Sequence, residues 1–347
     1  MADEVLNGDP LLATEYPPKG EKEAIDKIIG LLKERLEKDY PPPKRTRRDA
    51  HPKQHGLVKA EFTVSDNIAP ELKVGLFAKP ETYKSWIRLS NLNGGGSPDI
   101  SKDSRGLAIK LMGVPGTKLL EDELNATTQD FVFMSTDHFV TKDVAGFARL
   151  LKAVNGGKLK AILYFATHLK LFKLFTGINI QVSNLFQIPW GSTTPYLYGD
   201  RAVKYALIPK QKPTATIPTG DDISDNYLRE RMVENLSKGD VYFDFCIQLQ
   251  VDAKTMPIED PRVIWDKNKS PFIKVATVKI MKQVFDTPAQ QLYGDQLSFT
   301  PWHSLPEHRP LGGINRGRKA IYSTMSKFRH KRNNEVSKEP TTWKNFD

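Results

Sequence analysis

Residues 57–64, LVKAEFTV, alternate between apolar and polar side chains, which is the pattern of a half-buried β-strand. Runs of similar strand character recur along the chain with no regular alternation of strands and helices. In chain order they are 71–78, 85–92, 106–113, 130–136, 178–188, 201–208, 240–251 and 272–280. We therefore predict an α+β fold in which a closed antiparallel β-barrel carries helices packed outside it.

Helical periodicity occurs in three places. Residues 21–40 form an amphipathic helix that Pro41–Pro43 end, and this helix is expected to dock on the body or on a neighbouring subunit. Residues 143–176 are expected to be helical, and 316–329 contain no helix breaker after Gly317. The apolar residues expected to be buried in the second region are Phe147, Leu150, Leu151, Leu159, Ile162, Leu163 and Phe165.

These elements divide the chain into three parts. Residues 1–44 are an N-terminal arm with the amphipathic helix, 45–330 are the barrel domain, and 331–347 are a polar tail. The chain has 347 residues, of which 39 % are hydrophobic and 27 % charged, an ordinary globular composition. It has no run of 18 apolar residues, so no transmembrane segment is predicted.

Charge and cysteine content narrow the function classes. The net charge is +10, but the basic residues are dispersed and accompany no nucleic-acid motif, so no nucleic-acid partner is predicted. Cys246 is the only cysteine, which excludes an internal disulfide and favours a reducing, cytoplasmic location.

The third helix carries a candidate metal ligand. Arg318 and Tyr322 are four residues apart and share a helix face. A phenol has a pKa near 10, and a guanidinium at roughly 4 Å favours the phenolate by about 4 kcal/mol before desolvation. This arrangement can hold a tyrosinate, one of the few protein ligands of ferric haem. The pair gains weight only if the chain also supplies a distal acid/base and cations for haem propionates.

Candidates for those groups lie upstream, in RDAHPKQHG (48–56). His51 and His55 are alternatives for the acid/base, and as an i,i+4 pair they also raise the alternative of zinc, although Pro52 disfavours a helix there. Arg48 lies three residues before His51. Arg88 lies in a predicted strand on the face opposite its apolar neighbours, where a buried guanidinium needs an anion.

Several blocks, in order, resemble the catalase-like haem protein superfamily. RDAHPKQHG resembles the distal-histidine block, and the segment from Ser85 to Leu111 resembles the one with a haem-contacting arginine and an Asp-x-Arg-Gly strand start. TQDFVFMSTD (128–137) resembles the strand with the distal amide. MPIEDPRVIW and SPFIKVATVKI resemble the later barrel, and RKAIY (318–322) resembles the proximal helix. The resemblance covers roughly residues 45–330.

The resemblance implies a haem b cofactor and residue roles. Tyr322 would be the axial iron ligand, stabilised by Arg318. His51 would be the distal base, and Arg48 and Arg88 would bind propionates. Phe133 would lie near the haem face. His51 is favoured over His55 because family members have a small residue at the position of His55.

Two departures separate the chain from typical catalases. Gln129 falls at the position of the distal asparagine, with Asn125 as the alternative, and Ala50 replaces a bulky residue before the distal histidine. The chain also ends soon after the proximal helix. It therefore resembles the small catalase-related branch, which includes peroxidases and allene oxide synthases.

Three functions are consistent with these residues. The first is a haem peroxidase or catalase-like enzyme that cleaves hydrogen peroxide or organic peroxides, with an organic electron donor. The second is an isomerase or lyase of fatty-acid hydroperoxides, which a basic channel mouth would favour. The third is a non-enzymatic haem-binding protein. A homo-oligomer is compatible with each of them.

Overall fold

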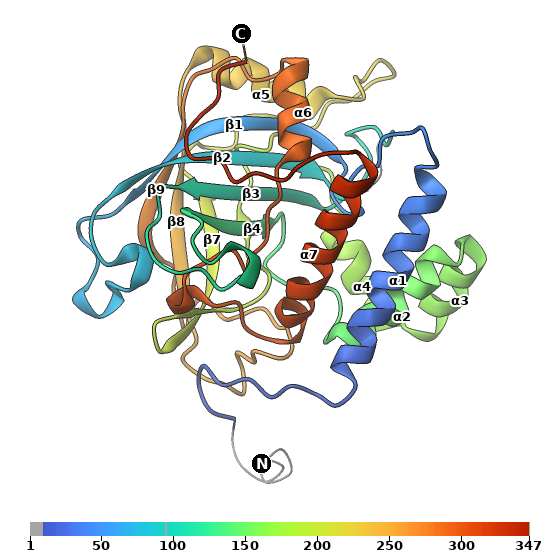
Figure 1. The fold of residues 1–347 in the computed structure, drawn as a ribbon, viewed down its shortest axis with the longest axis horizontal. Coiled ribbons are helices and arrows are strands. Elements are labelled where there is room, and N and C mark those ends of the chain that lie inside the picture. Colours follow the sequence, from blue (N-terminus) through green and yellow to red (C-terminus); the bar gives the residue numbers. More distant parts are fainter. Residues whose placement is uncertain (1–9, 94–95, 347) are drawn as a thin grey trace.

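A closed antiparallel β-barrel forms the body of the molecule, in a computed structural model that describes residues 10–93 and 96–346 (Figure 1). The hydrogen-bonded order is β5-β4-β3-β2-β1-β9-β8-β7, and β5 also pairs with β7, which closes a ring of eight strands; β6 extends the sheet beside β7. The predicted barrel is therefore confirmed. The strands are β1 (Lys53–Val64), β2 (Thr82–Asn91), β3 (Arg105–Met112), β4 (Thr128–Met134), β5 (Trp190–Gly191), β6 (Tyr196–Tyr198), β7 (Arg201–Pro209), β8 (Val241–Leu249) and β9 (Ile273–Ile280).

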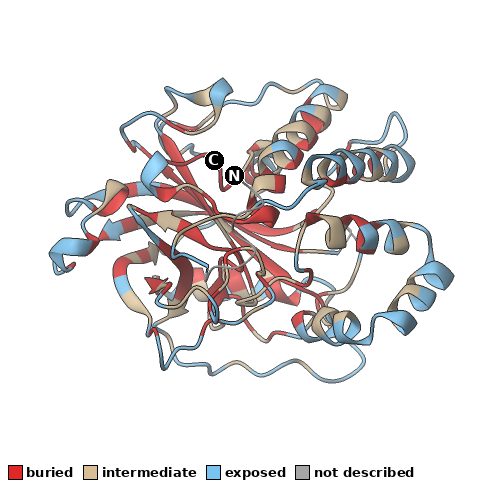
Figure 2. Ribbon diagram, turned by 90° about the horizontal axis from the view of Figure 1, so that it is seen from below, coloured by how far each residue is buried: buried red, intermediate tan, exposed pale blue. Residues whose placement is uncertain are grey.

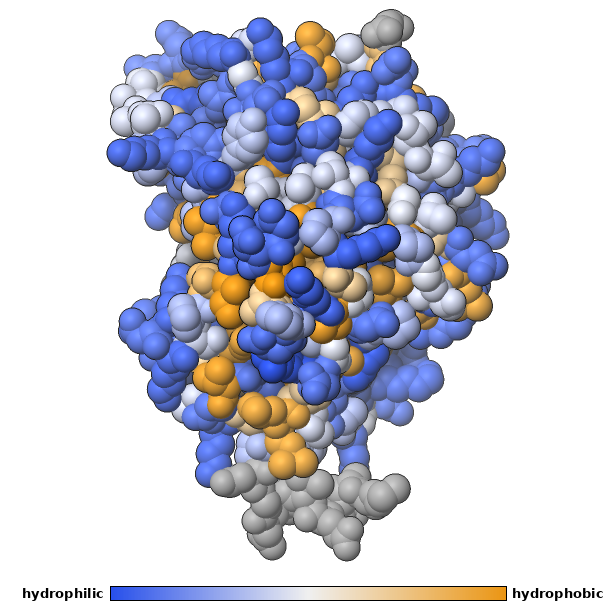
Figure 3. All heavy atoms as spheres, turned by 90° about the vertical axis from the view of Figure 1, so that its left-hand side faces the viewer, coloured by the Kyte–Doolittle hydropathy of each residue, from blue (hydrophilic) through white to orange (hydrophobic). Residues whose placement is uncertain are grey.

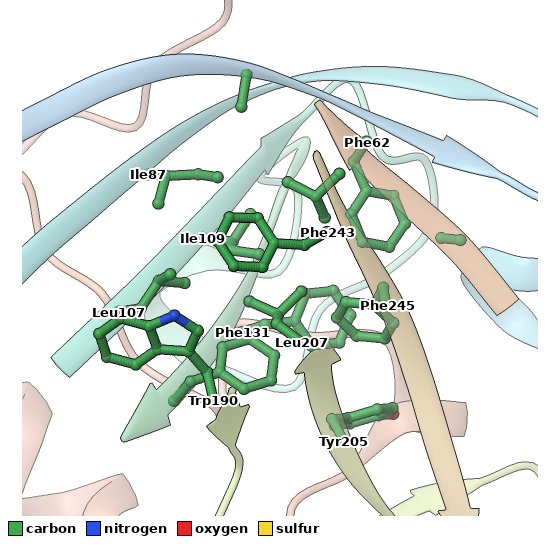
Figure 4. Packing of buried hydrophobic residues seen from close by; sticks show 14 of the residues in the cluster. Phe62, Ile87, Leu107, Ile109, Phe131, Trp190, Tyr205, Leu207, Phe243 and Phe245 are labelled. Atoms are coloured by element: carbon green, nitrogen blue, oxygen red, sulfur yellow. The ribbon is translucent and has the colours of Figure 1, made fainter. Parts of the chain in front are cut away.

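Aromatic side chains fill the barrel interior (Figure 4). The ring of Phe245 on β8 lies 5.0 Å from that of Phe62 on β1 and 4.9 Å from that of Phe131 on β4, with both pairs edge to face. All three rings are buried. Because one side chain in two points inward along each strand, this packing leaves the other face of the strands for contacts outside the barrel.

Two predicted strands are not strands. Residues 71–78 form two 3₁₀ turns, η2 (Pro70–Leu72) and η3 (Gly75–Phe77), because Pro70 starts the first turn and Gly75 has a φ of +51°. Residues 178–188 form only an isolated bridge, between Ile180 and Asp103. The sequence analysis also did not predict the helices α5 (Tyr227–Lys238) and α6 (Pro288–Gln296) or the 3₁₀ turns η4 (Glu121–Glu123) and η5 (Pro306–His308). It likewise missed the short strands β5 and β6.

Three helices pack together outside the barrel: α1 (Glu21–Asp39), α2 (Val144–Asn155) and α7 (Gly313–Arg332). They share one apolar cluster, in which Ile28 and Leu32 of α1 meet Ile321 of α7. The predicted amphipathic helix therefore docks on the body of its own chain. The predicted C-terminal helix is also present, and it extends three residues beyond each expected end.

The helices α3 (Lys158–Thr167) and α4 (Leu169–Ile178) project away from the barrel (Figures 1 and 2). Leu150 and Leu151 of α2 are buried as predicted, but the expected burial of Leu159, Ile162 and Leu163 is wrong: they are 70, 64 and 60 % exposed. No single helix in the described ranges is long and apolar enough to cross a membrane.

The polar tail lies against the barrel. The indole N–H of Trp343 donates to the carbonyl of Ser85 at 2.9 Å, and the ring of Phe346 packs on that of Trp86 at 6.1 Å. Glu339 forms an ion pair with buried Lys110 at 2.6 Å. On the side of the molecule opposite α3, hydrophobic atoms occur in small groups among hydrophilic ones (Figure 3).

Candidate functional site

A cavity of about 560 Å³ lies outside the barrel, between its wall and α7. This volume is within the usual range of cofactor and ligand sites, roughly 300–1,000 Å³. Its walls come from the segment before β1, from the outward face of β2–β4 and from one side of α7. The wall residues used below are Arg48, Ala50, His51, Arg88, Gly106, Ala108, Glu123, Val132, Phe133, His303, Tyr322, Ser323, Arg329 and Glu339.

Strand register explains which residues reach this cavity. Arg88 of β2 pairs with Ala108 of β3, which pairs with Val132 of β4, so the three side chains form one row on the same face of the sheet. The residues adjacent to these on each strand face the opposite way. Ile109, after Ala108, and Phe131, before Val132, point into the barrel (Figure 4). Two-residue periodicity thus assigns one set of side chains to the core and the other to the cavity.

His51 lies against the backbone of Gly106. A Cβ atom at position 106 would lie 2.5 Å from the His51 ring, so the stacking of the imidazole on β3 requires glycine there. The His51 backbone has a φ of +58°, a left-handed conformation uncommon outside glycine. Within the described residues, the buried ring nitrogen Nδ1 of His51 has no hydrogen-bond partner. This enclosed nitrogen is an unsatisfied donor or acceptor packed against β3.

The electrostatic surroundings keep His51 neutral. Burial, together with the positive charges of Arg88, Arg48 and Arg318, lowers the pKa of His51 to about 3. A neutral imidazole can accept a proton from a bound molecule.

His55, the alternative to His51, does not line the cavity. It is buried, its Nε2 lies 2.6 Å from Oδ1 of Asn91, and its Nδ1 lies 3.7 Å from Oδ2 of Asp99. Burial lowers the pKa of His55 to about 4. The zinc alternative is not supported, because no described cluster of metal-type ligands includes His51 or His55.

Three arginines meet at one end of the cavity. Arg88 approaches the carboxylate of Asp295 at 3.5 Å, Arg48 donates to the backbone carbonyl of Asp295 at 3.1 Å, and Arg329 donates to the same carbonyl. Burial lowers the pKa of Arg88 well below its usual range and that of Arg329 to about 9. The carboxylates of Asp49 and Glu335 also act on this cluster, so its positive charge is partly compensated, and the remaining excess favours a bound anion.

The sequence analysis predicted Arg48 and Arg88 for this place but missed Arg329. A signal was available: Arg329 lies seven residues after Tyr322, which is close to two helical turns and puts both residues on the same side of α7. The structure brings these residues to the same cavity.

Tyr322 lines the cavity, and Arg318 lies one turn before it on α7. The buried Arg318 donates from Nη1 to Thr194 Oγ1 and to Asn315 Oδ1, both at 3.0 Å. Both partners are neutral oxygens, so in the described structure no carboxylate neutralises this guanidinium. Its charge remains available to an anionic group nearby, although no hydrogen bond joins Arg318 and Tyr322 in the described residues.

The structure corrects the expected distal amide. Gln129 lies inside the barrel wall, where its Oε1 accepts the backbone N–H of Leu305 at 3.3 Å, and it does not line the cavity. Its neighbour Asp130 has the outward orientation and forms an ion pair with Lys110 at 2.7 Å. The alternative, Asn125, is exposed before β4 and also lies outside the cavity lining. The strand is thus offset by one residue from the expected orientation.

Phe133 lies between the barrel core and the cavity. It lines the cavity, and its ring also packs edge to face on that of Phe245 in the core, at 5.9 Å.

A polar cluster that the sequence analysis missed lines another part of the cavity. His303 Nδ1 lies 2.8 Å from Glu123 Oε2, and its Nε2 lies 2.8 Å from Thr128 Oγ1. Glu339 from the tail also bonds Thr128, at 2.6 Å. No local spacing in the sequence connects these residues, and Glu339 joins the other three only because the tail folds back.

Comparison with known proteins identifies the fold. No family model matches the chain, and no curated protein matches it. Solved structures do match: a fungal catalase with a TM-score of 0.65 and 16 % identity, catalase A from Saccharomyces cerevisiae with 0.63 and 17 %, and a bacterial catalase with 0.63 and 16 %. They cover 93, 94 and 99 % of this chain, which in turn spans 65, 68 and 70 % of their lengths. The chain therefore has a catalase-like fold.

The buried imidazole of His51 predicts a pH dependence. Its folded pKa of about 3 lies below the unfolded value of about 6.5, so below pH 6.5 the unfolded chain binds a proton that the folded chain does not. The contribution of His51 to the free energy of unfolding is therefore present above about pH 6.5 and is lost as the pH falls, by up to about 1.4 kcal/mol per unit. We expect His51→Asn to flatten this slope in urea unfolding between about pH 6 and pH 4.

The matched control is Ser323→Ala, which alters the same cavity without changing a titratable group. It should keep the wild-type slope. Equal slopes for wild type and His51→Asn would contradict a buried neutral imidazole.

Proposed function

We propose that this chain is a haem-dependent enzyme that cleaves the O–O bond of hydrogen peroxide or of organic hydroperoxides. The observation that carries the proposal is the presence in one cavity of Tyr322, His51 and the cluster of Arg48, Arg88 and Arg329. A phenol, a neutral imidazole and an excess of buried cations are the groups that an anionic haem and a peroxide require together.

The residues present fit haem b. The three arginines are suited to its two propionates, since charge-assisted hydrogen bonds to carboxylates are the strongest that guanidinium groups form. Gly106, Ala108 and Val132 give the adjacent wall small, largely apolar side chains suited to a flat macrocycle. Tyr322 would ligate the iron, and Arg318 lies one helical turn before it on α7.

When bound, the haem iron would supply the electron transfer that reduces the peroxide. The protein would supply proton transfers and positioning. His51 is neutral and lines the cavity, so its imidazole would take the proton of the peroxide O–H and return it to the departing oxygen. The arginines that lower its pKa also make the protonated state short-lived, which favours return of the proton.

The residues of the cavity wall favour oxidation of an organic donor over oxygen release from hydrogen peroxide. Neither Gln129 nor Asn125 reaches the cavity, so neither supplies an amide to hold a second small peroxide. Ala50, a small residue beside His51, lines the cavity and leaves room for larger molecules. We therefore favour a peroxidase with an organic electron donor over an efficient catalase, in a catalase-related branch. Isomerisation of fatty-acid hydroperoxides is the competing outcome of the tests below.

Tyr322→Phe tests the cofactor and its ligand. The wild type should show a high-spin ferric spectrum that includes phenolate charge-transfer bands. Removal of the phenolic oxygen should either abolish haem retention or eliminate those bands. Haem content per chain and the visible spectrum measure this. Tyr242→Phe, on β8 outside the cavity, should behave as wild type. Unchanged haem content and spectrum in Tyr322→Phe would show that another residue binds the iron.

His51→Ala tests the proton transfer. The variant should retain haem and lose about 10² to 10⁴ in the rate constant for peroxide cleavage, the range for a lost general acid–base group. Stopped-flow mixing with peroxide measures the rate per haem. His55→Ala is the control: it removes a buried hydrogen bond to Asn91 and should lower stability without a comparable loss of rate. The reverse pattern would assign catalysis to His55.

Reaction products distinguish the candidate activities. We expect oxygen release from hydrogen peroxide to be slow compared with oxidation of an added chromogenic donor, because neither predicted amide reaches the cavity. Gln129→Asn should leave this ratio unchanged, since Gln129 lies in the barrel wall. An oxygen electrode beside a donor assay gives both rates. Rapid oxygen release with negligible donor oxidation would indicate a catalase, and clean conversion of a fatty-acid hydroperoxide without donor oxidation would indicate the isomerase.

A further inference from the structure

The α3–α4 hairpin, residues 158–178, carries an apolar face that the protein does not cover. Leu159, Ile162 and Leu163 on α3 follow the spacing of one helix face and are 70, 64 and 60 % exposed. Leu169 and Phe172 on α4 are 69 and 46 % exposed. In this hairpin α3 lies at the outer edge of the molecule, beyond α1 (Figure 1).

The other face of the hairpin is anchored. Phe165 of α3 and Phe175 of α4 pack ring to ring at 5.3 Å and join a cluster with Phe147 and the buried Leu150 of α2. The hairpin thus has its own inward apolar contacts. Its exposed leucines, isoleucine and phenylalanine form a second face, which is larger than the scattered single apolar residues normal for a protein surface.

The charge of this region has one sign. Residues 144–199 contain no aspartate or glutamate. Four exposed lysines lie among the apolar residues of the hairpin: Lys158, Lys160, Lys170 and Lys173. Apolar side chains bordered by lysines are the pattern of helices that lie in the interface of an anionic membrane.

We propose that the α3–α4 hairpin binds the surface of an anionic lipid bilayer. Each helix has 10 residues, about 15 Å, which is half of the roughly 30 Å hydrocarbon core, and the two helices are bent by 117° at their junction. Short helices that are bent in this way can lie in the headgroup region. There the leucines and Phe172 enter the acyl boundary and the lysines meet lipid phosphate and carboxylate groups.

A second copy of the chain suits this face less well. In a two-fold contact the same surface meets itself, so the four lysines of one copy would face those of the other. The hairpin has no acidic residue to offset that repulsion. An anionic bilayer offers both hydrocarbon and negative charge. The proposal is independent of haem and of peroxide chemistry.

Vesicle sedimentation tests the proposal on the full chain. The wild type should sediment with vesicles containing phosphatidylserine and remain in the supernatant with phosphatidylcholine alone, and high salt should release it. Lys170→Glu/Lys173→Glu should weaken binding to anionic vesicles about tenfold or more, because each basic group contributes roughly a factor of five. Ile162→Gln/Leu163→Gln should weaken it comparably through the loss of apolar insertion.

Matched controls place the same changes elsewhere. Val284→Gln/Val336→Gln replaces two side chains that are 79 and 82 % exposed, and Lys210→Glu/Lys212→Glu reverses two exposed charges outside the hairpin. Both controls should bind anionic vesicles with an affinity closer to that of the wild type than the corresponding hairpin variants do. Circular dichroism verifies that each variant is folded.

Two outcomes would overturn the proposal. One is wild-type binding that is absent or equal for the two kinds of vesicle. The other is a dimer, seen by light scattering, that Ile162→Gln/Leu163→Gln dissociates, which would show that a second copy covers the face.

Discussion

The dense packing of the barrel interior is the constraint on which the other features depend. Phe62, Phe131 and Phe245 meet ring to ring at the centre, so the barrel has an aromatic core in place of a ligand chamber. Interiors packed in this way have no room for a large group. A ligand site must therefore form on the outer face of the strands, and a second layer must cover it. The helix α7 supplies that layer, and α1 and α2 hold α7 through a separate apolar cluster.

Features with local causes were predictable from the sequence. Arg318 and Tyr322 lie on one helix whose spacing fixes their relation, and the strands of the barrel other than β5 lie in segments of recognisable strand character. Gln129 shows the limit of this reasoning, because its placement depends on strand orientation, and a shift of one residue reverses the face. The strand prediction for 71–78 failed for a different reason. Pro70 and Gly75 favour turns more strongly than the apolar alternation favours a strand.

Other features could not have been predicted because they need the folded chain. Ile162 and Leu163 are exposed although they are apolar. Helical periodicity identifies an apolar face, but it cannot tell whether that face packs on the core of the same chain or stays exposed. Glu339 reaches Lys110 and Thr128 only because the tail returns to the barrel. The tail, residues 331–347, therefore packs on the barrel through Glu339 and Trp343.

The cavity has walls from both ends of the chain: His51 precedes β1, whereas Arg329 belongs to the last helix. This distribution has a consequence for how the protein is made. While the chain is being synthesised, the barrel strands can emerge and pair before α7 has left the ribosome, but the cavity has only one wall during that time. A ligand that needs both walls can be taken up only after α7 has left the ribosome, so filling of the cavity follows the emergence of the barrel strands.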